Sequence, residues 1–239
     1  MVPYACDHSR DVTMSSALYG GRDPADVPAY RLPEAASMVG LPTSTLRSWV
    51  RGRSFPIRDG QGRSEPIIIA PDARALSFTN VVEAHVLAAM RRRYDLDLDT
   101  IRRAVRWVTD VMRVDHPLAR VQFKTDKLNL FVEHLGDVIS ASDGGQLGMR
   151  KVLDLYLERI EYGKDDRAVR LFPLYRANAP RVVVIDPRVA FGRPVIAGTA
   201  APIADIADRR DAGESVADLA LDYDVTPEEI EEALSAAVA

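Results

Sequence analysis

The sequence YRLPEAASMVGLPTSTLRSW runs from Tyr30 to Trp49. It predicts two short helices joined by a tight turn. Pro33 suits the first turn of a helix, where a missing N–H costs nothing. Gly40 ends that helix, because glycine readily adopts left-handed backbone angles. Leu46 and Trp49 lie on one side of the second helix. This order predicts a helix-turn-helix whose second helix enters the major groove of DNA.

The other side of the second helix carries hydroxyl and guanidinium groups, which suit contacts with base edges and phosphates. We expect it to contact DNA through Thr43, Ser44, Arg47 and Arg51. The alternative interpretation of the same residues is a helical hairpin with no role in DNA binding.

A wing is predicted after the second helix, between residues 51 and 78. Residues 55–57 form a short strand, DGQG at residues 59–62 forms a turn, and residues 66–69 return as a second strand. Three arginines lie near the tip, where they would meet phosphates or a minor groove. They are Arg53, Arg58 and Arg63.

Two helices are predicted next. Ser77 caps the first, from Phe78 to about Arg93, and Asp97 caps the second, from about Leu98 to Met112. The exposed side of the second helix is expected to carry Arg102, Arg103 and Arg106.

The region up to residue 113 resembles MerR-type regulators. The matching positions are Tyr30, Glu34, Ala36, Gly40, Leu41, Thr45, Leu46, Arg47 and Trp49. There are three departures: Arg31 stands where a hydroxyl residue is usual, Val50 replaces an acidic residue, and Pro42 takes the N-cap position of the recognition helix. Thr43 offers a hydroxyl one residue later. The resemblance implies a winged helix-turn-helix over residues 30–113, preceded by a disordered tail over residues 1–29.

Residues 114–180 predict an α+β connector. Residues 121–124 and 128–132 alternate enough to suggest strands, and residues 138–139 suggest a further one. Residues 147–160 have helical periodicity, and residues 167–173 suggest a closing strand. The connector is either a dimer contact or a spacer.

Residues 181–239 predict a strand at 181–185 followed by three helices. The first runs from about Pro202 to Ala212, Ser215 caps the second, and Thr226 with Glu229 forms a capping box for the third. The expected fold class is therefore mainly α with small β elements, or α+β.

This last segment resembles domain of unknown function 433, an antitoxin-like module. The matching positions are Asp186, Pro187, Gly192, Arg193, Pro194, Ile196, Gly198, Thr199, Pro202, Gly213, Ser215, Tyr223 and the turn from Thr226 to Glu229. Ala200 replaces the arginine that usually follows Gly-Thr. The whole order resembles VapB-type antitoxins, whose partners are PIN-like ribonuclease toxins.

Charge is distributed unevenly along the chain. The net charge is −4, yet residues 30–125 hold 16 basic against 10 acidic residues, and residues 181–239 hold 5 against 12. Affinity for phosphate follows the local field, so the basic front can bind DNA while the acidic rear suits another partner.

Composition and motifs argue against several classes of protein. The 239 residues are 47% hydrophobic and 28% charged, as in globular proteins. No apolar run approaches the roughly 20 residues that span a bilayer, and the first ten residues lack the order of a signal peptide, so we expect a cytoplasmic protein. Cys6 is the single cysteine. The histidines show no metal-ligand spacing, and no nucleotide-binding or nucleophile motif occurs. We expect no enzyme, no cofactor and no metal.

Three functions stay open. The first is an antitoxin that binds a PIN-like ribonuclease and represses its own operon. We expect Arg188 and Arg193 to contact the toxin. A homodimer is expected, because one short recognition helix reads only a few base pairs. The second is a stand-alone MerR-type regulator whose C-terminal module senses a ligand or partner. The third is an adaptor without a DNA role.

Overall fold

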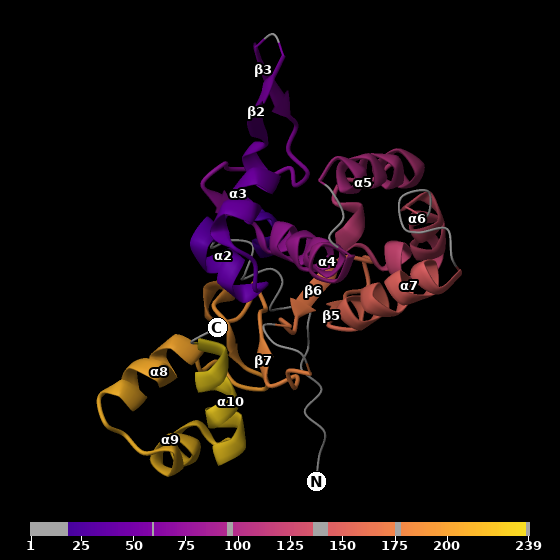
Figure 1. Cartoon of the computed structure of the whole chain (residues 1–239). Coiled ribbons are helices and arrows are strands. Elements are labelled where there is room, and N and C mark those ends of the chain that lie inside the picture. Colours follow the sequence, from indigo (N-terminus) through magenta and orange to yellow (C-terminus); the bar gives the residue numbers. More distant parts are fainter. Residues whose placement is uncertain (1–18, 59, 95–97, 136–142, 175–177, 238–239) are drawn as a thin grey trace.

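The computed structural model describes residues 19–58, 60–94, 98–135, 143–174 and 178–237. Within these ranges the fold is mainly helical, with four two-stranded antiparallel sheets, so the predicted α+β class is confirmed (Figure 1). The sheets pair β1 with β4, β2 with β3, β5 with β6 and β7 with β8.

The helix-turn-helix consists of α2 (Leu32–Met38) and α3 (Thr43–Arg51). Gly40 has a φ of 61° and closes the turn. The N–H of Leu41 donates to the carbonyl of Ala36 at 2.8 Å, and the N–H of Gly40 donates to that of Ser37 at 2.9 Å. These two bonds form a Schellman motif, which satisfies carbonyls that would otherwise be unpaired at the end of α2. The glycine turn was correctly predicted.

The wing is a hairpin of β2 (Arg53–Ile57) and β3 (Gly60–Ser64), which projects from the body of the molecule (Figure 1). Its register pairs Arg53 with Ser64 and Ile57 with Gly60. The predicted return strand at residues 66–69 was wrong. The N–H groups of Ile67 and Ile68 donate to the carbonyl of Trp49 at 2.7 and 3.1 Å, so this apolar run covers the end of α3 instead of extending the hairpin.

Helix α4 (Phe78–Tyr94) lies at the centre of the molecule (Figure 1). The hydroxyl of Ser77 accepts from the N–H of Asn80 at 3.2 Å, which confirms the predicted cap. Residues 78–90 are buried on every side of the helix, not on one face alone. Neighbours on the different sides are the 3₁₀ turns at Pro24–Asp26 and Pro117–Ala119, helix α7 (Asp143–Leu157) and strand β6 (Ala168–Leu171).

Residues 19–29, assigned to a tail from the sequence, are ordered against this centre. Pro24 and Ala25 are buried, and the N–H of Ala29 donates to the carbonyl of Leu76 at 3.0 Å. Strand β1 (Tyr30–Arg31) then pairs with β4 (Ala75–Leu76). The segment is held because its apolar residues fill space beside α4.

The two strands predicted at residues 121–124 and 128–132 were wrong, because both segments are helical. Phe123–Lys127 forms a π-helical turn, and α6 (Leu128–Leu135) follows. Leu128, Phe131, Val132 and Leu135 are all buried. Their spacing of three, four and seven residues is that of a helix face, so helical periodicity outweighed the short alternation. The strand expected at residues 138–139 and the cap at Asp97 lie outside the described residues.

The rest of the connector follows its prediction more closely. Helix α5 (Leu98–Met112) contacts α6, which contacts α7. The expected closing strand is confirmed as β6, which pairs with β5 (Ile160–Tyr162). Helix α7 ends at Leu157, three residues before the predicted end, and Ile160 belongs to β5 instead.

The C-terminal module contains the three predicted helices, α8 (Ile203–Asp211), α9 (Val216–Tyr223) and α10 (Pro227–Ala237). The hydroxyl of Ser215 accepts from the N–H of Asp218 at 3.1 Å, and that of Thr226 accepts from the N–H of Glu229 at 3.2 Å, so both caps are confirmed. The strand expected over residues 181–185 is shorter: β7 (Val183–Val184) pairs with β8 (Val195–Ile196).

Two main apolar cores organise the described residues. The larger runs from Ala25 to Ile185 and includes both the helix-turn-helix and the connector, while the smaller lies within residues 183–233 and supports α8–α10. The front of the molecule is therefore packed as one continuous body. The predicted domain boundaries at residues 29, 113 and 180 stay predictions.

Candidate nucleic-acid interface

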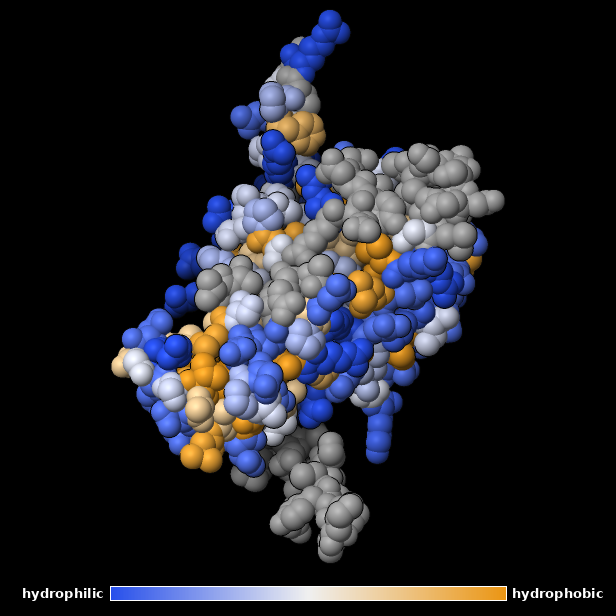
Figure 2. All heavy atoms as spheres, turned by 60° about the horizontal axis from the view of Figure 1, so that its bottom comes forward, coloured by the Kyte–Doolittle hydropathy of each residue, from blue (hydrophilic) through white to orange (hydrophobic). Residues whose placement is uncertain are grey.

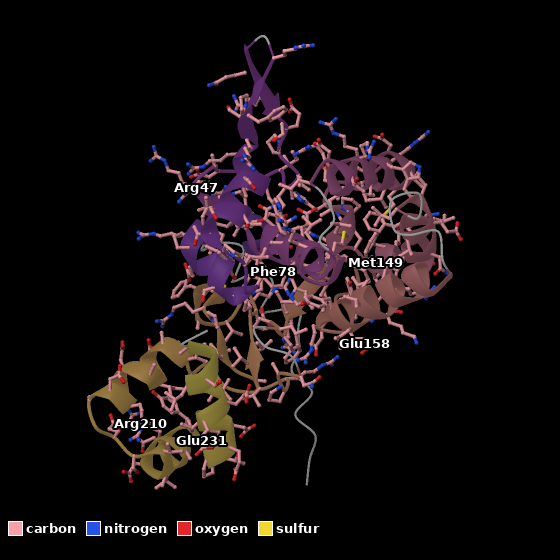
Figure 3. All side chains as sticks on the ribbon, in the orientation of Figure 1. Arg47, Phe78, Met149, Glu158, Arg210 and Glu231 are labelled. Carbon is pink, nitrogen blue, oxygen red and sulfur yellow. The ribbon has the colours of Figure 1, made fainter. Side chains whose placement is uncertain are left out.

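Helix α3 buries one side and exposes the other. Leu46 and Trp49 are completely buried, and Val50 nearly so. On the opposite side Ser44 and Arg47 are exposed, and Thr43 is partly exposed. Figure 3 shows Arg47 directed away from the body of the protein. The predicted contact residues are thus free to meet another molecule.

The beginning of α3 also faces outward without a side-chain cap. Pro42 occupies the N-cap position and has no side-chain acceptor, and Thr43, the expected source of a hydroxyl cap, makes no capping bond there. The first N–H groups of a helix and its dipole favour anions. An uncapped, exposed helix start can therefore accept a phosphate.

Arginines link α3 to the hairpin. The Nε of Arg51 donates to the carbonyl of Ala73 at 3.0 Å, and Arg63 donates to the carbonyl of Arg51 at 3.5 Å. The first bond ties the end of α3 to the loop before β4, and the second ties the hairpin to the end of α3. Arg53 and Arg58 are exposed further along the hairpin. Figure 2 shows the hairpin as a thin, mainly hydrophilic projection.

Two arginines that the sequence did not single out complete the surface. One shallow depression is lined by Arg31, Leu32, Pro33, Arg47, Arg51 and Arg74. A second is lined by Val50, Arg51, Arg63, Pro66, Ala73 and Arg74. Arg74 belongs to both, although the loop that carries it gave no periodic signal. Arg31 had been noted only as a departure from the MerR-type pattern. We call these seven arginines the basic face: Arg31, Arg47, Arg51, Arg53, Arg58, Arg63 and Arg74.

Few carboxylates accompany the basic face. Between residues 42 and 64 the single acidic residue is Asp59, which lies outside the described residues. Asp72 is nearby, and its carboxylate accepts from the backbone N–H of Arg74 at 2.8 Å. Guanidinium groups outnumber carboxylates on this surface, so it attracts polyanions.

Arg102 does not belong to the exposed side of α5, contrary to the prediction. It is 8% exposed, donates its Nε to the carbonyl of Glu65 at 2.9 Å and forms an ion pair with Asp99. It therefore holds the base of the wing against α5. Arg103 and Arg106 are exposed as expected.

Comparisons with known proteins agree with this geometry. Residues 28–105 match the family described as "Putative DNA-binding HTH domain", and residues 183–236 match "Protein of unknown function (DUF433)". The chain is 31% identical over 235 residues to the Mycobacterium tuberculosis protein described as "Putative antitoxin VapB45", a match covering 90% of this chain and 95% of that protein. This chain belongs to the VapB-type antitoxin family.

A solved structure supports the fold of this VapB-type chain. The crystal structure of Rv2018 from Mycobacterium tuberculosis matches with a TM-score of 0.68 and 27% sequence identity, over 87% of this chain and 98% of that chain. Antitoxin family membership and the DNA-binding helix-turn-helix point to an antitoxin or DNA-binding regulator that is not an enzyme. The resemblance to MerR-type regulators in particular stays a prediction.

The two arginines predicted to contact a toxin differ in their interactions within the C-terminal module of this VapB-type chain. Arg193 donates to both oxygens of Asp205, at 2.9 and 3.4 Å. The side chain of Arg188 is exposed, and its backbone N–H donates to Asp186 at 2.9 Å. Hence Arg193 holds the loop against α8, whereas Arg188 faces solvent.

Two other features are absent from the described ranges. No group of three or more His, Cys, Asp or Glu side chains there could hold a metal ion. Nor is any described helix both long and apolar enough to cross a membrane.

Proposed function

We propose that this VapB-type chain is the antitoxin of a toxin–antitoxin pair. In this proposal it binds and blocks a PIN-like ribonuclease and, through the basic face, represses the operon that encodes both proteins. Binding an operator inside the cell would require the cytoplasmic location that the sequence suggests.

The basic face carries the DNA-binding part of the proposal. Arg47 lies at the middle of an exposed recognition helix, the start of α3 is open to a phosphate, and arginines extend along a projecting hairpin. Base-edge contacts by the exposed α3 residues would give sequence specificity, and the hairpin arginines would add phosphate contacts.

The acidic charge of the C-terminal helices supports the proposal that the second partner is a protein. Residues 203–237 contain eleven acidic side chains against Arg209 and Arg210. Carboxylates at this density repel phosphate, so α8–α10 are unsuited to a second DNA contact. The PIN-like class of the toxin rests on the family resemblance, since PIN-type nucleases are described as VapB partners.

A homodimer is part of the same proposal. A nine-residue recognition helix reaches only a few base pairs. Two copies on adjacent half-sites would supply the specificity that one copy lacks.

The function is tested by titrating DNA from upstream of the gene in a gel-shift assay at two salt concentrations. Arg47→Ala should weaken specific binding roughly 10- to 100-fold, because it removes a base-reading guanidinium. Arg210→Ala, an exposed arginine in the acidic module (Figure 3), is the matched control and should bind like the wild type. Equal affinity of Arg47→Ala and wild type would show that α3 does not read DNA.

Co-expression with the ribonuclease from the neighbouring gene separates an antitoxin from a stand-alone MerR-type regulator. An antitoxin should restore growth and co-purify with the nuclease. A regulator with a ligand-sensing C-terminal module should do neither, while still binding the upstream DNA.

A further inference from the structure

One loop of the C-terminal module presents a large aromatic ring to solvent. Phe191 is 75% exposed, the second most exposed of the large apolar side chains in the described part of the chain, after Leu221 at 82%. It lies in the short turn Ala190–Gly192, between β7 and β8. An aromatic ring of this size normally contributes to a core or an interface.

The backbone that carries this ring is strained. Ala190, Phe191 and Gly192 have φ values of 46°, 56° and 80° in succession. Left-handed angles are unfavourable for alanine and more so for phenylalanine, and they persist only when the surroundings impose them. Residues held in this way often belong to binding sites.

Hydrogen bonds hold the backbone of the loop around the ring. The N–H of Val189 donates to the carbonyl of Asp186 at 3.0 Å, and the N–H of Gly192 donates to the carbonyl of Val189 at 2.8 Å. The carboxylate of Asp186 also accepts from the Nε of Arg170 at 2.9 Å. These bonds hold the backbone at both ends of the turn, and so set the direction in which the side chain of Phe191 leaves it.

The base of the loop is packed against Tyr30 of β1, directly before the helix-turn-helix. Gly192 is buried, and a Cβ on it would lie 2.2 Å from the hydroxyl oxygen of Tyr30. Tyr30 itself is 2% exposed. The loop is thus anchored on the inside by the front body, while Phe191 points out.

A free cation accompanies the ring. The side chain of Arg188 is exposed and forms no hydrogen bond or ion pair with the described residues, whereas Arg193 is engaged with Asp205. Arg188 and Phe191 are three residues apart on this hydrogen-bonded loop. A partner that fits both would have an apolar pocket bordered by carboxylates.

We propose that Phe191 is the apolar anchor and Arg188 the charged contact through which this chain binds the ribonuclease. This inference rests on the proposed antitoxin function. The exposed guanidinium of Arg188 supplies a positive charge that would pair with a carboxylate at the edge of the ribonuclease pocket. A rigid aromatic side chain is the usual kind of interface hot spot, because little conformational freedom is lost when it binds.

The test is a calorimetric titration of the full-length chain with the ribonuclease from the neighbouring gene. Phe191→Gly removes the ring and suits the left-handed backbone, so it should raise the Kd by roughly 30-fold or more without lowering the melting temperature. Arg188→Ala should raise the Kd about tenfold. Leu221→Ala and Arg210→Ala remove an equally exposed apolar side chain and an exposed arginine from the same module, and both should change the Kd less than threefold.

The outcomes separate the two proposals. If the wild type binds and both loop variants bind as tightly, the antitoxin function stands and the loop is not its contact. A loss of affinity in Leu221→Ala alone would move the interface to α9 and overturn the inference. A wild type that does not bind the nuclease at all would overturn the proposed function and this inference together. If Phe191→Gly instead lowered the mass of the free chain in sedimentation, the ring would be a contact between copies, which also overturns the inference.

Discussion

Gly192 is the residue at which the C-terminal loop meets Tyr30 of β1, directly before the helix-turn-helix. Gly192→Ala should destabilise the protein, because it adds the strain of a left-handed alanine and a clash with the buried hydroxyl of Tyr30. We expect a loss of about 2 kcal/mol or more, seen as a melting temperature lowered by about 4 °C or more.

The matched control for this substitution is Gly198→Ala. Gly198 has a φ of 85°, and a Cβ on it would meet nothing within 4 Å. The control therefore reports the backbone strain alone. If the two alanine variants melt at the same temperature, the packing of Gly192 against Tyr30 contributes nothing to stability.

His116 makes a stability contribution that depends on pH. Its Nδ1 lies 2.9 Å from the carboxylate of Glu83, which is 5% exposed. This bond raises the pKa of His116 above its ordinary value of 6.5 against the opposing effect of burial, and Asp26 and Asp115 add attraction. A raised folded-state pKa stabilises the protein fully below the unfolded pKa, and the stabilisation is lost as pH rises through the folded value.

The melting temperature of the wild type should accordingly fall as pH rises from about 6 through the raised pKa of His116. His116→Asn is the comparison, because asparagine tolerates the left-handed backbone at this position, where φ is 55°. The variant should melt at a temperature that changes less over the same range. Parallel curves for the two proteins would contradict this account.

Single residues could be predicted from the sequence where a strong helical period fixed their direction. The exposure of Arg47 followed from the burial of Leu46 and Trp49 on the opposite side of α3. Arg102 could not be placed in this way, because its partner is a backbone carbonyl 37 residues away. The exposed ring of Phe191 depends on backbone angles that its sequence alone did not reveal.

At the scale of elements, the hairpin should act on DNA through charge more than through shape. A variant with Arg53, Arg58 and Arg63 replaced by glutamine loses three cations from one element. If each meets a phosphate, the slope of log K against log salt should become shallower by about 2 to 3. The discrimination between upstream and unrelated DNA should change little, since phosphate contacts carry no sequence information.

Fluorescence anisotropy at several salt concentrations provides this slope. A slope equal to that of the wild type would show that the hairpin does not touch the DNA backbone. Replacing Arg103 and Arg106 on α5 provides a matched control, because both are exposed but lie outside the basic face.

Helices with caps were the elements most accurately predicted. Ser77, Ser215 and Thr226 each begin the expected helix, because a capping hydroxyl acts over a few residues and needs no distant partner. The strands were predicted less accurately than the helices. Apolar residues at 66–69 cover the end of α3, and those at 128–135 form a helix face, so short alternation was a poor guide where packing decided the outcome.

At the scale of the whole molecule, the front and rear differ in both charge and packing. The helix-turn-helix and the connector share one apolar core, while α8–α10 have their own. The family and the broad fold could be predicted because motifs lie at both ends of the chain. The continuity of the front core could not, since it depends on contacts between α4 and segments far along the sequence.

We propose that the basic face binds DNA and the C-terminal module binds the nuclease, on separate surfaces that can be occupied together. The most direct test mixes the full-length chain, the neighbouring ribonuclease and upstream DNA, and measures mass by light scattering after size-exclusion chromatography. The account predicts one species that contains all three components. Release of the DNA when the nuclease is added, or absence of either binary complex, would contradict it.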